Sequence, residues 1–120
     1  MSKRTVVIGA SANPERYAYK AVASLMNHGH EVFPLGLRGG KIQDLDILTD
    51  RPALQHIDTV SLYVGPNNQA EWLDYIFALK PKRIIFNPGT ENPALEKKAE
   101  EQGIEAIEAC TLVLLSIGNY

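Results

Sequence analysis

A loop with the chemistry of a phosphate site follows the first apolar segment of the chain. It reads Gly9-Ala10-Ser11-Ala12-Asn13-Pro14, and a helix is expected directly after it. A helix N-terminus offers unpaired N–H groups and the positive end of the helix dipole, which suits a phosphate. Gly9 allows a tight turn, the Ser11 hydroxyl can donate a hydrogen bond, and Arg16 adds a charge-assisted contact. We predict a phosphate site here, against the alternative of an ordinary strand-to-helix turn.

The spacing of this loop bears on which phosphorylated ligand fits it. Ser11 and Pro14 stand where a Gly-x-Gly-x-x-Gly dinucleotide motif has its second and third glycines. An NAD site also needs an acidic residue near the end of the second strand, and that strand ends Phe33-Pro34-Leu35-Gly36. The sequence therefore disfavours NAD.

The nearby cations are Arg38 and Lys41, in a glycine-rich loop. They suit a phosphorylated ribose, either the 2′-phosphate of NADP or the 3′-phosphate of coenzyme A. The alternative is that both are solvated surface cations.

No spacing of histidines, acidic residues or the cysteine in the sequence indicates a catalytic site. His28 and His30 flank the end of the first helix, where a histidine meets the helix dipole, and His56 lies in a polar loop. The acidic residues lie in an irregular segment or on a solvated helix face. Cys110 follows the last strand, where it can contact a bound thiol or, as the stronger expectation, pack as a small buried side chain. We predict a non-catalytic protein without a metal site.

The elements that position these loops alternate between strand and helix. Apolar runs predict strands at 5–8, 31–35, 59–64, 83–86 and 104–107, and residues 37–57 are expected to be irregular. Helices are expected from about Arg16 to Met26, after Pro66, from Pro93 with Asn92 as N-cap, and between Cys110 and Gly118. We expect a Rossmann-like, doubly wound α/β sheet of about five mainly parallel strands, in the order 3-2-1-4-5, with helices on both faces. Ligands bind such sheets beyond the carboxyl ends of the strands.

The size and charge of the chain limit its function class. Its 120 residues predict one domain over 1–120, and the net charge of -2 argues against a nucleic-acid partner. The longest apolar run, 112–115, is too short for a membrane span, and its leucines offer a homodimer surface if they do not pack internally. One cysteine and the absence of a signal-like N-terminus predict a cytoplasmic protein.

Several segments together resemble the small single-domain CoA-binding proteins, whose domain is similar to the nucleotide-binding domain of the succinyl-CoA synthetase alpha subunit. The resemblance covers nearly the whole chain and is carried by Val7–Ser11, Asn13–Tyr17, His28–Pro34, Asn87–Gly89, Gly103-Ile104 and Cys110. It departs from the family pattern between Leu35 and Asp58. Ligase activity is not implied, because the synthetase carries its phosphorylated histidine in a second domain, which a chain of this length lacks.

The resemblance also implies roles for individual residues. Gly9, Ser11, Asn13 and Arg16 would surround the phosphates, and Pro34 with the loop after it would lie beside the adenosine. The pantetheine side would be bordered by Asn87 and Gly89. The leading hypothesis is a non-catalytic or regulatory module for coenzyme A or an acyl-CoA. The alternatives are an NADP-binding enzyme or redox sensor, and an interaction protein with a relic nucleotide site.

Overall fold

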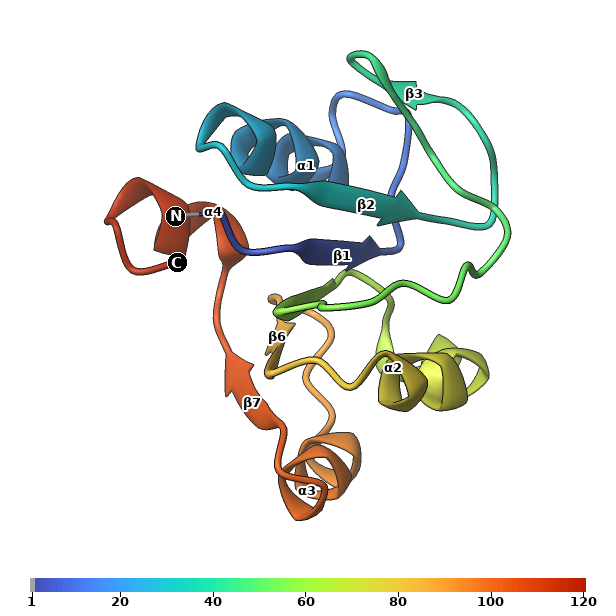
Figure 1. Ribbon diagram of the computed structural model, residues 1–120, viewed down its shortest axis with the longest axis vertical. Helices are drawn as coiled ribbons and strands as arrows, with labels where there is room; N and C mark the ends of the chain where they lie inside the picture. The colour runs from blue at the N-terminus through green and yellow to red at the C-terminus, as the bar shows by residue number, and fades with distance from the viewer. Residues whose placement is uncertain (1) are drawn as a thin grey trace.

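A five-stranded parallel sheet forms the centre of the protein in the computed structural model, which describes residues 2–120 (Figure 1). Its neighbouring strands are parallel in every pair. The strands are β1 (Thr5–Ile8), β2 (Val32–Leu35), β5 (Thr59–Leu62), β6 (Arg83–Phe86) and β7 (Glu105–Glu108). The three central strands are buried at every position, as strands covered on both faces must be. The predicted α/β fold is confirmed.

The order of the strands is β2-β1-β5-β6-β7, which corrects the predicted order 3-2-1-4-5. The third of these strands along the chain pairs with β1 and not with the outer edge of β2. That outer edge is unsuited to a full strand pair, because Pro34 faces it and has no N–H to donate. The carbonyl of Pro34 accepts a hydrogen bond there from the N–H of Leu48 at 2.8 Å.

The connection between β2 and β5 is the segment that sets this order. It contains a small antiparallel hairpin of β3 (Lys41–Ile42) and β4 (Leu45–Asp46), and it touches the sheet through one isolated bridge, Leu35 to Leu48. The chain then crosses to the other side of β1. In a sheet of this kind, the ligand crevice lies where the strand order reverses, which is here between the carboxyl ends of β1 and β5.

Helices cover both faces of the sheet. The helices α1 (Tyr17–Asn27) and α4 (Thr111–Ser116) lie on one face, and α2 (Leu73–Leu79) and α3 (Pro93–Glu101) lie on the other (Figure 1). Alternate side chains of β1 therefore belong to different core clusters, with Val7 facing α1, and Val6 and Ile8 facing α2 and α3. None of these helices is long and apolar enough to cross a membrane.

The ends of the helices follow the sequence signals closely. Asn92 is the N-cap of α3, and its side chain accepts a hydrogen bond from the N–H of Leu95 at 3.2 Å. Pro93 occupies the first turn, and Gly103 follows the helix with a φ of +79°. Before α2, by contrast, Pro66 begins a short 3₁₀ turn, η1 (Pro66–Asn68), and a second one, η2 (Ala70–Trp72), leads into the helix.

The short helix α4 only partly supports the expectation of a homodimer. Leu115 packs into the core at 5% exposure, so one of the leucines that could have paired between copies is used internally. Val113 and Ile117 face outward at 52% and 60% exposure. The homodimer stays a prediction.

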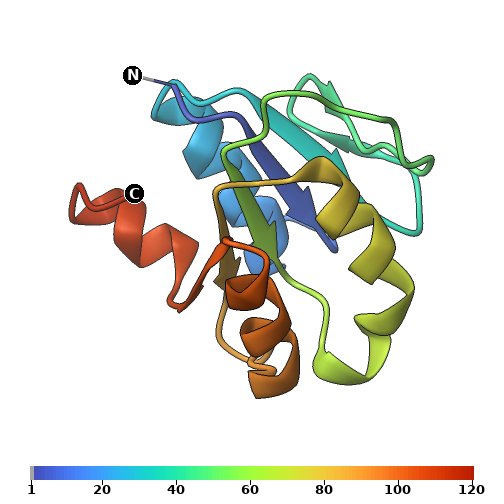
Figure 2. The ribbon, with the colours of Figure 1, turned by 60° about the horizontal axis from the view of Figure 1, so that its bottom comes forward.

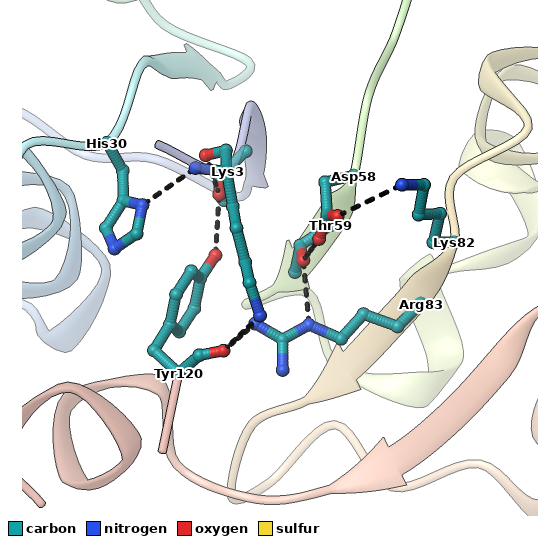
Figure 3. Close-up of polar contacts among 8 residues, drawn as sticks. Lys3, His30, Asp58, Thr59, Lys82, Arg83 and Tyr120 are labelled. Carbon is teal, nitrogen blue, oxygen red and sulfur yellow. Dashed lines mark hydrogen bonds and ion pairs between the residues drawn. The ribbon is translucent and has the colours of Figure 1, made fainter. Parts of the chain in front are cut away.

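The residues after α4 return to the amino ends of the strands, opposite the ligand crevice (Figure 3). The main-chain oxygen of Tyr120 accepts hydrogen bonds from Lys3 Nζ at 2.6 Å and from Arg83 at 2.9 Å. Its phenol oxygen is 2.6 Å from Thr5 Oγ1, and its ring packs at a tilt of 55° against His30, with 4.9 Å between the ring centroids. These contacts hold the residues after α4 against the amino ends of the strands.

Candidate functional site

The turn after β1 brings three strand ends into close contact. The N–H groups of Gly9 and Ala10 both donate to the carbonyl of Leu35 at 2.9 Å. Gly9 has a φ of +94°, and a Cβ atom there would lie 2.8 Å from the main-chain oxygen of Tyr63. Only glycine fits a left-handed position this close to another main chain. The turn therefore lies at the crevice between β1, β2 and β5.

The loop between Gly9 and α1 is organised by its own polar side chains. Ser11 Oγ accepts the N–H of Asn13 at 3.1 Å, and Asn13 Oδ1 accepts the N–H of Glu15 at 3.0 Å. Arg16 is the N-cap of α1 in an extended conformation, and no side chain caps this helix. The first-turn N–H groups of α1 are thus available to an acceptor, and the Ser11 hydroxyl keeps its proton for one.

A cavity of about 770 Å³ lies at this helix start. Ser11, Arg16 and Arg38 line it, so the structure brings together cations that are far apart in the sequence. Glu15 lines it as well. The two guanidinium groups, the Ser11 hydroxyl and the helix N-terminus form a cationic setting that suits a phosphate.

A second cavity, of about 440 Å³, adjoins the first and shares Gly9, Arg38 and Tyr63 with it. Most of its other lining is apolar or uncharged, and Glu71 is its one acidic side chain. The lining residues that it does not share are Ala10, Gly36, Leu37, Val64, Gly65, Asn68, Glu71 and Trp72. A ligand that occupies both cavities would place phosphates beside α1 and a less charged portion against Trp72.

Tyr63 stands between the two cavities with a buried hydroxyl. Its phenolic oxygen has no hydrogen-bond partner among residues 2–120. Burial raises the pKa of the Tyr63 phenol well above its usual range, and the neighbouring Cys110 raises it further. The phenol is therefore neutral at physiological pH, and its buried oxygen is closed to a ligand in either cavity.

Five of the predicted site residues line neither cavity, and Asn87 is one of them. Pro34 lines a separate groove on the outer edge of β2, and Lys41 forms an ion pair with Asp46 at 3.5 Å. Gly89 is exposed in the turn after β6, where its N–H donates to Glu91 Oε1 at 2.8 Å. Asn13 is exposed in the first loop and acts through the loop's conformation.

The side chain of Asn87 forms hydrogen bonds through both its amide nitrogen and its oxygen. Its amide nitrogen donates to Ser61 Oγ at 3.0 Å and to the carbonyl of Leu62 at 2.9 Å, and its oxygen accepts the N–H of Thr111 at 2.8 Å. The side chain is completely buried. Asn87 therefore joins β5, β6 and α4, and both of its N–H donors are occupied.

The structure adds residues to the site that the sequence did not single out. Tyr63, Glu71 and Trp72 follow β5, whose loop was expected at the crevice, but no residue type or spacing marks them as ligand contacts. The three histidines and Cys110 line neither cavity. Residues 2–120 hold no group of three His, Cys, Asp or Glu side chains that could bind a metal ion.

Comparison with known protein families decides the family of this chain. The family model described as "CoA binding domain" matches residues 3–116. The chain belongs to the CoA-binding domain family. The resemblance seen in the sequence is thus confirmed over nearly its whole length.

Solved structures agree with this CoA-binding domain assignment at the level of the fold. A crystal structure described as that of an "uncharacterized protein" is 47% identical, covers 100% of this chain and 99% of its own, and has a TM-score of 0.98. A hypothetical protein from Pyrococcus horikoshii OT3 is 25% identical with a TM-score of 0.79, covering 93% of this chain and 80% of its own. Among curated proteins, none matches the sequence.

A third structure, cell-free ID.343 from Thermus thermophilus, shares the fold alone. It is 22% identical with a TM-score of 0.84 and covers 99% of this chain and 91% of its own.

Proposed function

We propose that this chain binds coenzyme A or an acyl-CoA at the two adjoining cavities, as a non-catalytic module of the cytoplasm. The proposal rests on one observation. Arg16 and Arg38 line the same cavity, of about 770 Å³, at the start of α1. Membership of the CoA-binding domain family supports the class of ligand.

The residues of the larger cavity fit a set of phosphates. The first-turn N–H groups of α1 and the Ser11 hydroxyl would donate to phosphate oxygens, and the two arginines would neutralise their charge. Glu15 lies at the same cavity and is exposed, so its carboxylate can remain in solvent.

The residues of the smaller cavity fit the uncharged parts of the ligand. Leu37, Val64 and Trp72 offer apolar contact, and Glu71 with Asn68 can bond hydroxyl or amide groups. The bound cofactor would supply a thiol or a thioester. The chain's own residues would hold and orient it, and Tyr63 would form part of the wall that the two cavities share.

Isothermal titration calorimetry with CoA, acetyl-CoA and NADPH tests the ligand class. We expect heat with CoA or acetyl-CoA, and we expect NADPH not to displace them. Ser11→Asp should weaken binding, because it places a carboxylate against the phosphates, whereas Ser116→Asp, exposed on α4, should not. No heat with CoA or acetyl-CoA at millimolar ligand would overturn the proposal. NADPH binding without competition by CoA would instead support the alternative ligand.

The non-catalytic part of the proposal needs its own measurement. Acetyl-CoA incubated with the protein should be recovered intact by mass spectrometry after prolonged contact. Release of free CoA faster than in buffer, and lost in the Ser11→Asp variant, would show that the chain turns its ligand over.

A further inference from the structure

A groove on the outer edge of β2 is separate from the proposed CoA site. It has a volume of about 690 Å³ and lies between β2 and the segment 44–54, which Figure 2 shows passing beside that strand on its way to β5. None of its lining residues belongs to either cavity at Gly9. Of the predicted ligand residues, it contains only Pro34.

The floor of the groove is apolar and only half covered. Both clusters of the hydrophobic core reach the surface here, one through Phe33, Leu48 and Leu54 and the other through Met26 and Leu45. All five side chains are half-buried. Half-covered apolar side chains that meet in one groove with a charged rim can serve as a binding surface.

The rim of the groove is acidic. Glu31, Asp44, Asp46 and Asp50 line it, and the Arg4 guanidinium lies 4.9 Å from the centroid of the Phe33 ring. Glu31 is paired with Arg4, and Asp46 with Lys41. Asp44 and Asp50 are exposed and form no ion pair within residues 2–120. The groove therefore presents two free carboxylates above an apolar floor.

A short stretch of main chain beside the groove remains open to an occupant. β2 is the edge strand of the sheet, and its outer side is bridged only at Leu35, by Leu48. The outward carbonyl of Pro34 already accepts the N–H of Leu48, which leaves the main chain of Val32 on this side for an occupant. An extended segment laid in the groove, without pairing along the whole strand, would turn alternate side chains toward the apolar floor and the intervening ones toward the rim.

We propose that this groove binds an extended segment of a partner protein in which apolar residues alternate with lysine or arginine. Apolar side chains of the segment would cover the floor, and its cations would pair with Asp44 and Asp50. The occupant is chosen by charge complementarity, because the two unpaired charges of the groove, Asp44 and Asp50, repel an acidic partner and would stay unpaired with an uncharged one. The proposal stands apart from the CoA site.

The test is a nuclear magnetic resonance titration of the full chain, labelled with ¹⁵N, with a capped hexapeptide that alternates lysine and valine. We expect saturable shifts of the amide signals of the groove residues, with those of Ser11 and Arg38 unchanged. A hexapeptide alternating glutamate and valine should cause none. No saturable shift in the groove at millimolar peptide would overturn the proposal.

Two comparisons separate a built groove from general attraction to an acidic protein. The double variant Asp44→Asn/Asp50→Asn should bind roughly fivefold more weakly, as expected for the loss of two exposed charge pairs. The matched double variant Glu100→Gln/Glu101→Gln, exposed on α3, should bind as the parent does. Equal weakening by both pairs would overturn the proposal. Equal binding of a lysine–serine hexapeptide or of spermine at the groove would also overturn it, because the apolar floor would then contribute nothing.

Discussion

A Cβ atom on residue 9 would lie 2.8 Å from the main-chain oxygen of Tyr63, so the turn after β1 touches the end of β5 directly. Gly89 has the same φ of +94° but has no atom within 4 Å of its Cβ position. The two glycines share a backbone conformation and differ in what surrounds them, which makes them a matched pair for experiment.

Gly9→Ala should destabilise the protein far more than Gly89→Ala does. Gly89→Ala meets only the strain of a left-handed residue, about 1–2 kcal/mol. Gly9→Ala adds the collision with Tyr63, for a total of about 3 kcal/mol or more. Urea unfolding followed by the fluorescence of Trp72, which is buried and is the only tryptophan, measures both free energies of unfolding. Equal losses would show that the contact with Tyr63 relaxes at no cost.

Asn87→Ala should reduce stability by about 3 kcal/mol, because it leaves the buried N–H of Thr111 and carbonyl of Leu62 without partners. The same unfolding experiment applies. Asn67→Ala, exposed in η1, should change stability by less than about 0.5 kcal/mol. A fully stable Asn87→Ala protein that had lost CoA binding would show instead that Asn87 serves the ligand.

Arg16→Gln and Arg38→Gln should each weaken CoA binding about tenfold, the loss expected from one charge-assisted hydrogen bond. Lys41→Gln should change the affinity by less than about twofold, because Lys41 pairs with Asp46 and lines neither cavity. Calorimetry with CoA measures all three. A loss with Lys41→Gln as large as with Arg38→Gln would contradict the arrangement of the cavities.

The free energy of unfolding should decrease as the pH falls below neutrality, because His30 then takes up a proton. Burial lowers the pKa of His30, and the charges of His28, Lys3 and Arg83 lower it further, while its Nδ1 accepts the N–H of Lys3 at 2.9 Å (Figure 3). The unfolded chain, with a histidine pKa near 6.5, therefore binds this proton more tightly than the folded chain does. The contribution of His30 is complete above a pH of about 6.5 and is lost as the pH falls toward its lower folded pKa.

Urea unfolding at a series of pH values measures this effect. His30→Gln should flatten the dependence below neutrality, because it removes the titrating group but keeps a hydrogen-bond acceptor for Lys3. His56→Gln, an exposed histidine that does not act on His30, serves as the control. An unchanged slope with His30→Gln would place the pH dependence in other residues.

The elements of the fold could be predicted because their signals are local. Apolar runs identified the five strands, Asn92 and Pro93 identified the start of α3, and helical spacing identified the buried face of α1. The Gly9 loop could be predicted as a candidate site for the same reason. A strand that ends in glycine before a helix determines its own turn geometry and leaves the helix N–H groups free.

The order of the strands was not predictable in the same way. It depends on which side of β1 the chain takes after β2, and the choice is made by a pairing between distant segments. Pro34 carries a signal, since a proline facing outward marks an edge. Its outward orientation became visible only when β2 was paired with β1.

The tertiary structure also decided what each candidate residue contacts. Arg38 lines the same cavity as Arg16, and Tyr63 lies against Gly9. Asn87 is buried and bonded to the start of α4, and Lys41 is paired with Asp46. By itself the sequence determined the elements, the glycine turn and the family, because propensities, caps and short motifs act between near neighbours along the chain. Which loops meet at the crevice was decided by sheet order and packing, whose free energy comes from contacts between residues far apart in sequence.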